Sequence, residues 1–229
     1  MIKDLLFGKI IRKPRRKTLL VALGVGVLCV AAVLFWRISS IAPSGKAIVC
    51  IDAGHGGSDV GAMHDGRYEK DDNLRLALAV GKILEENGIE VVYTRTKDEF
   101  VSLEDRAKFA NENNATYFVS LHRNSAESEV SGVEIWIRSD SHNDEAKLAQ
   151  KILDKIDGVG YGKNRGVKRG YQSNPNGDYL VNKNTNMPSC LVEMGFITTA
   201  GDNELFDEKF EEYARAVAEG IMAGIEQED

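Results

Sequence analysis

Two histidines and two glutamates lie at positions in this sequence where they could carry out metal-assisted hydrolysis. His55 lies in a glycine-rich turn directly after an apolar segment, and Glu69 lies just before a predicted helix that begins at Asp71. His122 and Glu193 each end a predicted buried strand. Two histidines and one carboxylate form a common catalytic zinc shell that leaves a position for water, and a second carboxylate near that water can act as a general base.

Some of these residues also have a structural interpretation. A glycine-rich turn after a strand is common and needs no ligand at His55. Glu69 can simply favour a helix start, where a carboxylate complements the helix dipole. Glu193 is harder to explain in this way, because a carboxylate that closes an apolar strand is costly to bury without a partner. Asp52 is expected to support the turn or to orient a ligand rather than to bind metal.

Apolar strands alternate with amphipathic helices along residues 47–226. This pattern predicts a single α/β domain with a twisted, mostly parallel sheet and helices on both faces. In such folds, functional side chains lie at the carboxyl ends of the strands, which is where the four residues above are expected. The predicted strands are 48–51, 89–96, 116–121, 133–137, 179–181 and 189–193; the predicted helices are 71–87, 102–113, 142–156 and 205–226; and 58–68 and 158–178 are predicted loops.

The N-terminal part of the chain has the pattern of a membrane anchor. Residues 18–36 contain no charge over 19 residues, enough for about 28 Å of helix, which would cross a bilayer core. The basic residues before this segment predict a cytoplasmic N-terminus, so the C-terminal domain would lie outside the membrane. We therefore expect a basic cytoplasmic tail (1–17), a transmembrane helix (18–36), a linker (37–46) and a globular domain (47–229).

A cleaved signal peptide is the alternative interpretation of the same segment. Ser40 and Ala42 would be the small residues before the cleavage site. The apolar run is longer than a usual signal core, however, and Pro43 would follow the cut. The sequence therefore favours a retained anchor and a cell-membrane location.

Charge is unevenly distributed along the chain. The whole sequence has a formal charge of −6, but residues 1–17 carry a net +6 and residues 38–229 a net −13. A nucleic-acid-binding domain would need a clustered basic face, so we expect no nucleic-acid partner.

Three cysteines do not make a disulfide framework. Cys29 lies in the apolar N-terminal run, and Cys50 and Cys190 lie within predicted buried strands. We expect these last two to be buried free thiols. A bond between Cys50 and Cys190 is the alternative if their strands come close together.

Six short motifs occur in order along the chain: I-D-A-G-H-G-G at 51–57, E-K at 69–70, T-R-T-K-D at 94–98, S-L-H-R-N at 120–124, N-R-G-V-K at 164–168 and L-V-E-M-G-F-I at 191–197. Together they resemble the zinc-dependent N-acetylmuramoyl-L-alanine amidases of the amidase-3 type. The similarity covers about residues 47–226 and is specific, because separate motifs recur in the right order.

The resemblance assigns roles to the matching residues. It implies that His55, Glu69 and His122 bind Zn²⁺, that Glu193 is catalytic, and that Arg165 belongs to the substrate groove. The resemblance also covers three further charged positions, for which a structural salt-bridge role is equally expected. These are Arg95, Asp98 and Arg106.

Two residues depart from the family pattern. The family often has a small residue and an alanine where this chain has Arg123 and Ser125. Arg123 either contacts an anionic substrate group or is merely solvated. We assign Arg123 and Asn124, together with Arg165, as the expected substrate-binding residues. Only 70 residues lie between His122 and Glu193, so we expect no long inhibitory helix there.

The resemblance predicts hydrolysis of the amide between N-acetylmuramic acid and L-alanine in peptidoglycan. A zinc peptidase that acts within the stem peptide is the alternative enzyme, and an inactive peptidoglycan-binding module is the alternative from another class. The expected partners are peptidoglycan, the cytoplasmic membrane through the anchor, and a regulatory protein. The short, anchored form also resembles the amidases of spore cortex maturation.

Overall fold

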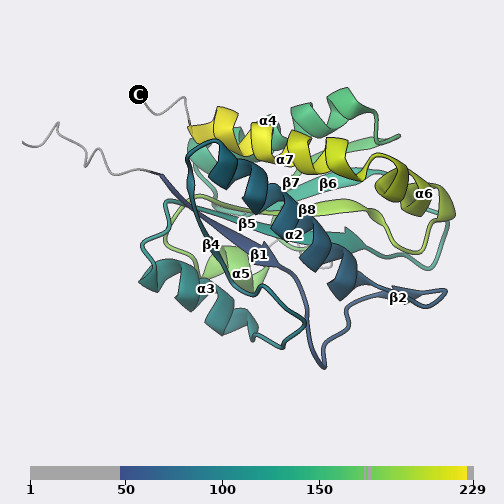
Figure 1. Cartoon of the computed structure of the whole chain (residues 1–229), viewed down its shortest axis with the longest axis horizontal. Coiled ribbons are helices and arrows are strands. Elements are labelled where there is room, and N and C mark those ends of the chain that lie inside the picture. Colours follow the sequence, from purple (N-terminus) through teal and green to yellow (C-terminus); the bar gives the residue numbers. More distant parts are fainter. Residues whose placement is uncertain (1–46, 173, 175–176, 226–229) are drawn as a thin grey trace, which may run out of the picture. The chain divides into compact units, whose positions relative to one another are not determined.

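The computed structural model describes residues 47–172, 174 and 177–225, which Figure 1 draws as a coloured ribbon. The expected basic tail, membrane anchor and linker all lie outside the described residues. Within the part that is described, none of the helices combines the length and hydropathy that a membrane crossing needs.

A six-stranded sheet forms the centre of the domain, in the order β4-β1-β5-β8-β6-β7. The first four strands of this order are parallel, whereas β6 runs antiparallel to β8 and parallel to β7. The sheet is therefore mostly parallel, as the sequence predicts. The strands are β1 (Ile48–Ala53), β4 (Glu90–Tyr93), β5 (Tyr117–Asn124), β6 (Val133–Ile137), β7 (Asn164–Arg169) and β8 (Ser189–Phe196).

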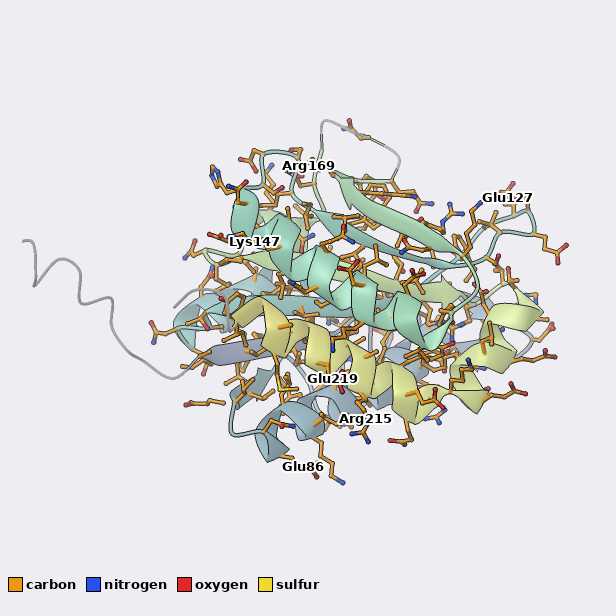
Figure 2. The ribbon with its side chains drawn as sticks, turned by 90° about the horizontal axis from the view of Figure 1, so that it is seen from above. Glu86, Glu127, Lys147, Arg169, Arg215 and Glu219 are labelled. Carbon is orange, nitrogen blue, oxygen red and sulfur yellow. The ribbon has the colours of Figure 1, made fainter. Side chains whose placement is uncertain are left out.

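Helices cover both faces of the sheet, but unequally (Figure 1). Three long helices pack over one face: α2 (Glu69–Glu86), α4 (Asn143–Val159) and α7 (Phe210–Ile225). Figure 2 shows α4 and α7 side by side, with Lys147, Arg215 and Glu219 on their outer side. The other face carries α3 (Leu103–Glu112) and the single turn α5 (Leu180–Lys183), and α6 (Ala200–Glu208) follows β8.

Alternation along the strands divides the core into two clusters. The larger cluster lies under α2, α4 and α7 and includes Ile51, Val119 and Val192. The smaller cluster lies under α3 and α5 and includes Cys50 and Phe118. Because the smaller face has less helical cover, its strands can expose polar groups at one end.

Four sequence-based element assignments are wrong in detail. The predicted strand 179–181 is the helical turn α5, since three residues are too few to distinguish the two periods. The predicted loop 158–178 contains β7, an edge strand whose polar composition hides the strand pattern. The predicted loop 58–68 contains the hairpin strands β2 (Met63–His64) and β3 (Arg67–Tyr68). The last predicted helix is two helices, α6 and α7, divided at Lys209 without a glycine or proline to mark the break.

The two described cysteines are free and buried, as predicted. Cys50 belongs to the smaller cluster and Cys190 to the larger one, so they face opposite sides of the sheet. Strand β5 also lies between their strands. A bond between these two thiols is therefore excluded in this fold.

Candidate metal centre and catalytic site

Neighbouring strands place a row of polar side chains on the face that carries α3. Each of these side chains lies an even number of positions along its strand from an apolar residue of the smaller cluster, so alternation keeps it on that face. Asp52 is paired with Ser120 in register, and Glu193 is paired with both His122 and Glu134. We call this row the polar layer; its members are Asp52, Ser120, His122, Asn124, Glu134 and Glu193.

His55, Glu69 and His122 come together at one end of the polar layer. Their potential ligand atoms all lie within 4.8 Å of one another. Glu69 Oε2 lies 3.2 Å from His55 Nε2, and Glu69 Oε1 lies 2.8 Å from His122 Nδ1. The structure therefore brings together the three residues that the sequence assigns to metal, and their two imidazoles and one carboxylate are the donor set that suits zinc.

The Glu69 carboxylate is fixed by the surrounding backbone as well as by the histidines. The amides of Ala62 and Arg123 donate to it at 2.8 and 3.2 Å, and Asn73 Nδ2 donates at 3.3 Å. Burial alone would raise the pKa of Glu69, but hydrogen bonds and charge from His122 and His55 outweigh burial and hold the pKa below its usual value. Glu69 is therefore an ionised carboxylate, the form that a cation requires.

His55 has a strained backbone that the surrounding structure stabilises. Its φ is +58°, a left-handed value that is uncommon outside glycine. Arg106 Nη2 donates to the His55 carbonyl at 2.7 Å, and Arg95 Nη2 donates to the preceding carbonyl of Gly54 at 3.0 Å. Both arginines thus act on the turn itself, which supports their structural interpretation.

The His55 ring is oriented by Asp59, a residue that the sequence analysis missed. Asp59 Oδ2 lies 2.9 Å from His55 Nδ1, which leaves Nε2 directed at Glu69. A carboxylate on the second nitrogen commonly orients a metal-binding histidine. Burial lowers the pKa of His55, but Glu69 and Asp59 outweigh burial and raise it to about 9. The cluster therefore favours positive charge, whether a proton or a metal ion carries it.

Gly54 allows the His122 ring to lie directly against the turn. A Cβ atom at position 54 would lie 2.2 Å from His122 Cε1 and Nε2. Contacts this short do not occur, so any larger residue would displace the imidazole.

Asp52 is the centre of a buried hydrogen-bond network under the turn. Arg106 Nη1 donates to Asp52 Oδ1 at 2.7 Å, and the hydroxyls of Thr94 and Ser120 donate to the carboxylate at 2.6 Å each. Burial would raise the pKa of Asp52, but Arg106 and the hydroxyl donors outweigh burial and lower the pKa. The sequence-based expectation that Asp52 supports the turn agrees with this geometry.

We expect Arg106→Met to lower the free energy of unfolding by about 3–5 kcal/mol, because it leaves Asp52 as a buried charge without its cation. Both side chains are at most 2% exposed, so water cannot replace the partner. Chemical denaturation measures the change. Lys108→Met, on the same helix but with a side chain that is 67% exposed, is the control and should cost under about 0.5 kcal/mol. Equal losses in the two variants would contradict the stabilising role of this ion pair.

Glu193 lies buried beside the metal cluster. Among the described residues, its Oε2 atom has no hydrogen-bond partner. Burial raises the pKa of Glu193 well above its usual value, and the negative charges of Glu69 and Glu134 raise it further. A buried carboxyl with a raised pKa and a free oxygen is typical of a proton-transferring group.

An open cleft of about 350 Å³ connects these groups to solvent. Residues of the metal cluster, Glu193 and Asn124 line it on the side of the sheet. A second set of lining residues comes from α3, α5 and the segment before α5; it consists of Leu103, Tyr171, Gln172, Tyr179, Leu180 and Val181.

Arg123 is not solvated, which corrects one of its two interpretations. It is 1% exposed, and alternation on β5 points its side chain away from His122. Its guanidinium donates to Asp72 at 2.6 Å and to Asn203 at 2.7 Å, and lies 4.3 Å from the Phe206 ring centroid. With these partners Arg123 connects β5 to α2 and α6, and its contact with a substrate stays a prediction.

Glu134 holds the other two expected substrate-binding residues. Its carboxylate accepts from Arg165 Nε at 2.7 Å, Asn124 Nδ2 at 3.0 Å and Lys168 Nζ at 2.6 Å. The sequence analysis missed Glu134, although a charged residue inside the apolar run 133–137 was a usable signal. Asn124 lines the cleft, whereas Arg165 lies beyond its lining on β7. Substrate binding by both stays a prediction.

The family of N-acetylmuramoyl-L-alanine amidases matches residues 49–227 of this chain. Because the match covers most of the sequence, the chain belongs to this family and is an amidase.

Two relatives from Bacillus subtilis (strain 168) are among the similar proteins. The uncharacterized protein YqiI is 38% identical over 78% of this chain and 82% of its own length. A sporulation-specific N-acetylmuramoyl-L-alanine amidase is 33% identical over 78% of this chain and 67% of its own length.

Solved structures of amidases are also similar to this chain. The amidase AmiC2 of Nostoc punctiforme is 36% identical, with a TM-score of 0.72 over 80% of this chain and 99% of its own. The CwlD amidase from Clostridioides difficile, solved in complex with the GerS lipoprotein, is 28% identical, with a TM-score of 0.71 over 80% of this chain and 99% of its own.

Proposed function

We propose that this amidase hydrolyses the bond between the lactyl group of N-acetylmuramic acid and the L-alanine of the stem peptide, with zinc held by His55, Glu69 and His122. One observation carries the proposal: the free, buried oxygen of Glu193 lines the same cleft as a cluster of two histidines and a glutamate. Membership of the amidase family supports the bond and the metal.

The metal ligands and Glu193 have different roles in the proposed hydrolysis. A zinc ion bound by the three ligands would polarise a carbonyl oxygen and make water more acidic. Glu193 accepts a proton from the attacking water while the oxygen of that water adds to the lactyl carbonyl carbon. The same carboxyl then gives that proton to the amide nitrogen as the carbon–nitrogen bond breaks, leaving a lactyl carboxyl group and a free L-alanine amine.

Product analysis tests the proposed bond. The full-length protein, loaded with zinc, is incubated with intact muropeptides, and the products are analysed by mass spectrometry and amino-terminal labelling. We expect peptides that begin with free L-alanine, together with muramic acid that has lost its peptide. New amino termini inside the stem peptide would instead identify a peptidase, and unchanged muropeptides would indicate a binding module.

Metal content tests the proposed ligands. His122→Ala should abolish stoichiometric zinc binding, because it removes one of three protein ligands. His64→Ala is the control, since this histidine has a 40% exposed side chain and lies outside the cluster. Elemental analysis of the folded proteins measures the effect. Stoichiometric zinc in the His122 variant would refute the assignment.

We also propose that residues 18–36 keep the protein in the cytoplasmic membrane with its catalytic domain outside. The uncharged run of 19 residues and the basic residues before it support this location. Full-length protein should stay with membranes after alkaline washing, while external protease digests the domain. A mature chain in the medium that begins near Pro43 would contradict the anchor.

A role in spore cortex maturation and a regulatory protein partner complete the proposal. The sporulation-specific relative supports the setting, and the solved complex of an amidase with a lipoprotein supports the partner. Muropeptide profiles of spore and vegetative walls from a deletion strain would distinguish the two settings.

A further inference from the structure

One wall of the cleft is apolar and aromatic, and the described contacts of the catalytic residues do not explain it. Leu103, Tyr171 and Leu180 line the cleft yet are 48%, 40% and 39% exposed. Exposing large apolar side chains together is unfavourable unless a ligand or partner covers them, and in a cleft they commonly mark a binding surface. Among the described lining residues from α3, α5 and the segment before α5, the charged one is Arg106, which is buried and donates to Asp52. The others carry no charge.

Three aromatic rings connect this wall to the sheet. The Tyr171 ring packs edge-to-face on Tyr179, with ring centroids 4.8 Å apart, and Tyr179 packs on Trp136 at 5.8 Å. Trp136 is buried, and its Nε1 donates to Glu134 at 2.9 Å. The exposed Tyr171 ring is therefore the outermost of three rings in edge-to-face contact, and a tyrosine ring offers a large contact area at little cost in side-chain entropy.

The opposite side of the cleft has a different character. It contains the metal cluster, Asp59 and Glu193, so charges and hydrogen-bonding groups dominate it. The substrate has two arms, one on each side of the scissile amide. The sugar arm is uncharged as long as its lactyl group is held in the amide bond, whereas the peptide arm carries charged groups. An uncharged wall cannot compensate for the desolvation of a carboxylate or an ammonium group.

We propose that Tyr171, supported by Leu103 and Leu180, forms a sugar-binding wall that holds the pyranose ring next to the scissile amide. A pyranose ring presents C–H groups on its faces and hydroxyls around its edge. The C–H face fits the electron-rich face of Tyr171, and the Gln172 amide at the same wall can meet the hydroxyl or acetamido groups. The peptide arm then leaves over the charged side. This assignment rests on the proposed function.

Binding of the two arms separately tests the assignment. Zinc-loaded full-length protein is titrated with peptide-free glycan strands and, separately, with free stem peptide, neither of which contains the scissile bond. Tyr171→Ala should weaken glycan binding by about tenfold, in the range of one lost aromatic contact. Stem-peptide binding should change less than twofold, and KM for muropeptides should rise while kcat is retained.

Two control variants sharpen the test. Tyr171→Phe keeps the ring and should bind glycan like the wild type. Leu78→Ala removes a side chain that is 37% exposed and does not line the cleft, and it should change neither affinity. Unchanged glycan affinity in Tyr171→Ala, a selective loss of peptide affinity, or a wild type that binds no glycan would overturn the proposal. Failure of the proposed function would show separately, as muropeptides that the wild type leaves uncut.

Discussion

Replacing Glu193 with glutamine is expected to slow muropeptide turnover by about 10²–10⁴-fold while zinc stays bound. Glutamine has nearly the same size, so the packing around this buried position should survive. Its amide can neither accept the proton of the attacking water nor pass a proton to the leaving amine. The expected loss corresponds to roughly 3–5 kcal/mol of activation free energy.

Three measurements on one preparation separate a catalytic role from a structural one. Zinc content and thermal midpoint should match the wild type, and only the turnover rate should fall. Glu127→Gln, at a labelled surface position in Figure 2, is the matched control and should leave all three unchanged. If Glu193→Gln retains more than about a tenth of the wild-type rate, the assignment of the general base is wrong.

The pH dependence of the reaction gives a second test of Glu193. Burial and the charges of Glu69 and Glu134 raise the pKa of this carboxyl. A general base acts only when deprotonated, so a raised pKa shifts the acid limb of the kcat/KM profile to higher pH. We expect this limb above about pH 4.3, the pKa of an ordinary glutamate, and we expect Glu193→Gln to lack it.

Gly54→Ala is expected to have a comparable effect on activity through the metal site. The added Cβ would lie 2.2 Å from His122 Nε2, so the imidazole must move, and a ligand misplaced by about 1 Å can cost 10²-fold in rate. Zinc affinity should fall with activity, because the displaced ring is a ligand. Competitive titration with a chelator measures the affinity.

Gly158→Ala is the control for this substitution. It lies in α4, and its added Cβ would meet nothing within 4 Å, so it should retain full zinc affinity and activity. Alanine in a helix is favoured over glycine by about 0.5–1 kcal/mol, so the control should be slightly more stable. Wild-type zinc affinity in folded Gly54→Ala protein would show that the turn does not constrain His122.

The sequence was sufficient to predict the strands and helices that carry the site. Apolar runs marked β1, β5 and β8, and the residues at or near their ends are those that the structure brings together. Elements with a weak pattern were missed: β7 is polar because it lies at an edge, and α5 is one turn long. A local sequence pattern does not show that a strand lies at the edge of a sheet or that a helix is only one turn long.

Side-chain direction limited the prediction of the site itself. Arg123 follows His122 directly, and period-2 alternation on β5 already implies that the two point to opposite faces. Asp59 and the aromatic wall were not predictable in this way, and for Glu134 the charged residue inside the apolar run 133–137 was a signal of burial but not of its partners. Their roles depend on contacts between segments that are distant in the chain, such as Arg165 with Glu134, and on the course of loops that have no periodic pattern.

The two edge strands of the central sheet affect the tendency of the domain to aggregate at high concentration. An exposed edge strand offers unpaired backbone groups to a neighbouring molecule, and charged or short strands oppose such pairing. One edge, β4, has only four residues, and the other, β7, carries Arg165, Lys168 and Arg169. Two β7 edges would bring like charges together. The sheet should therefore resist edge-to-edge aggregation even at high local concentration.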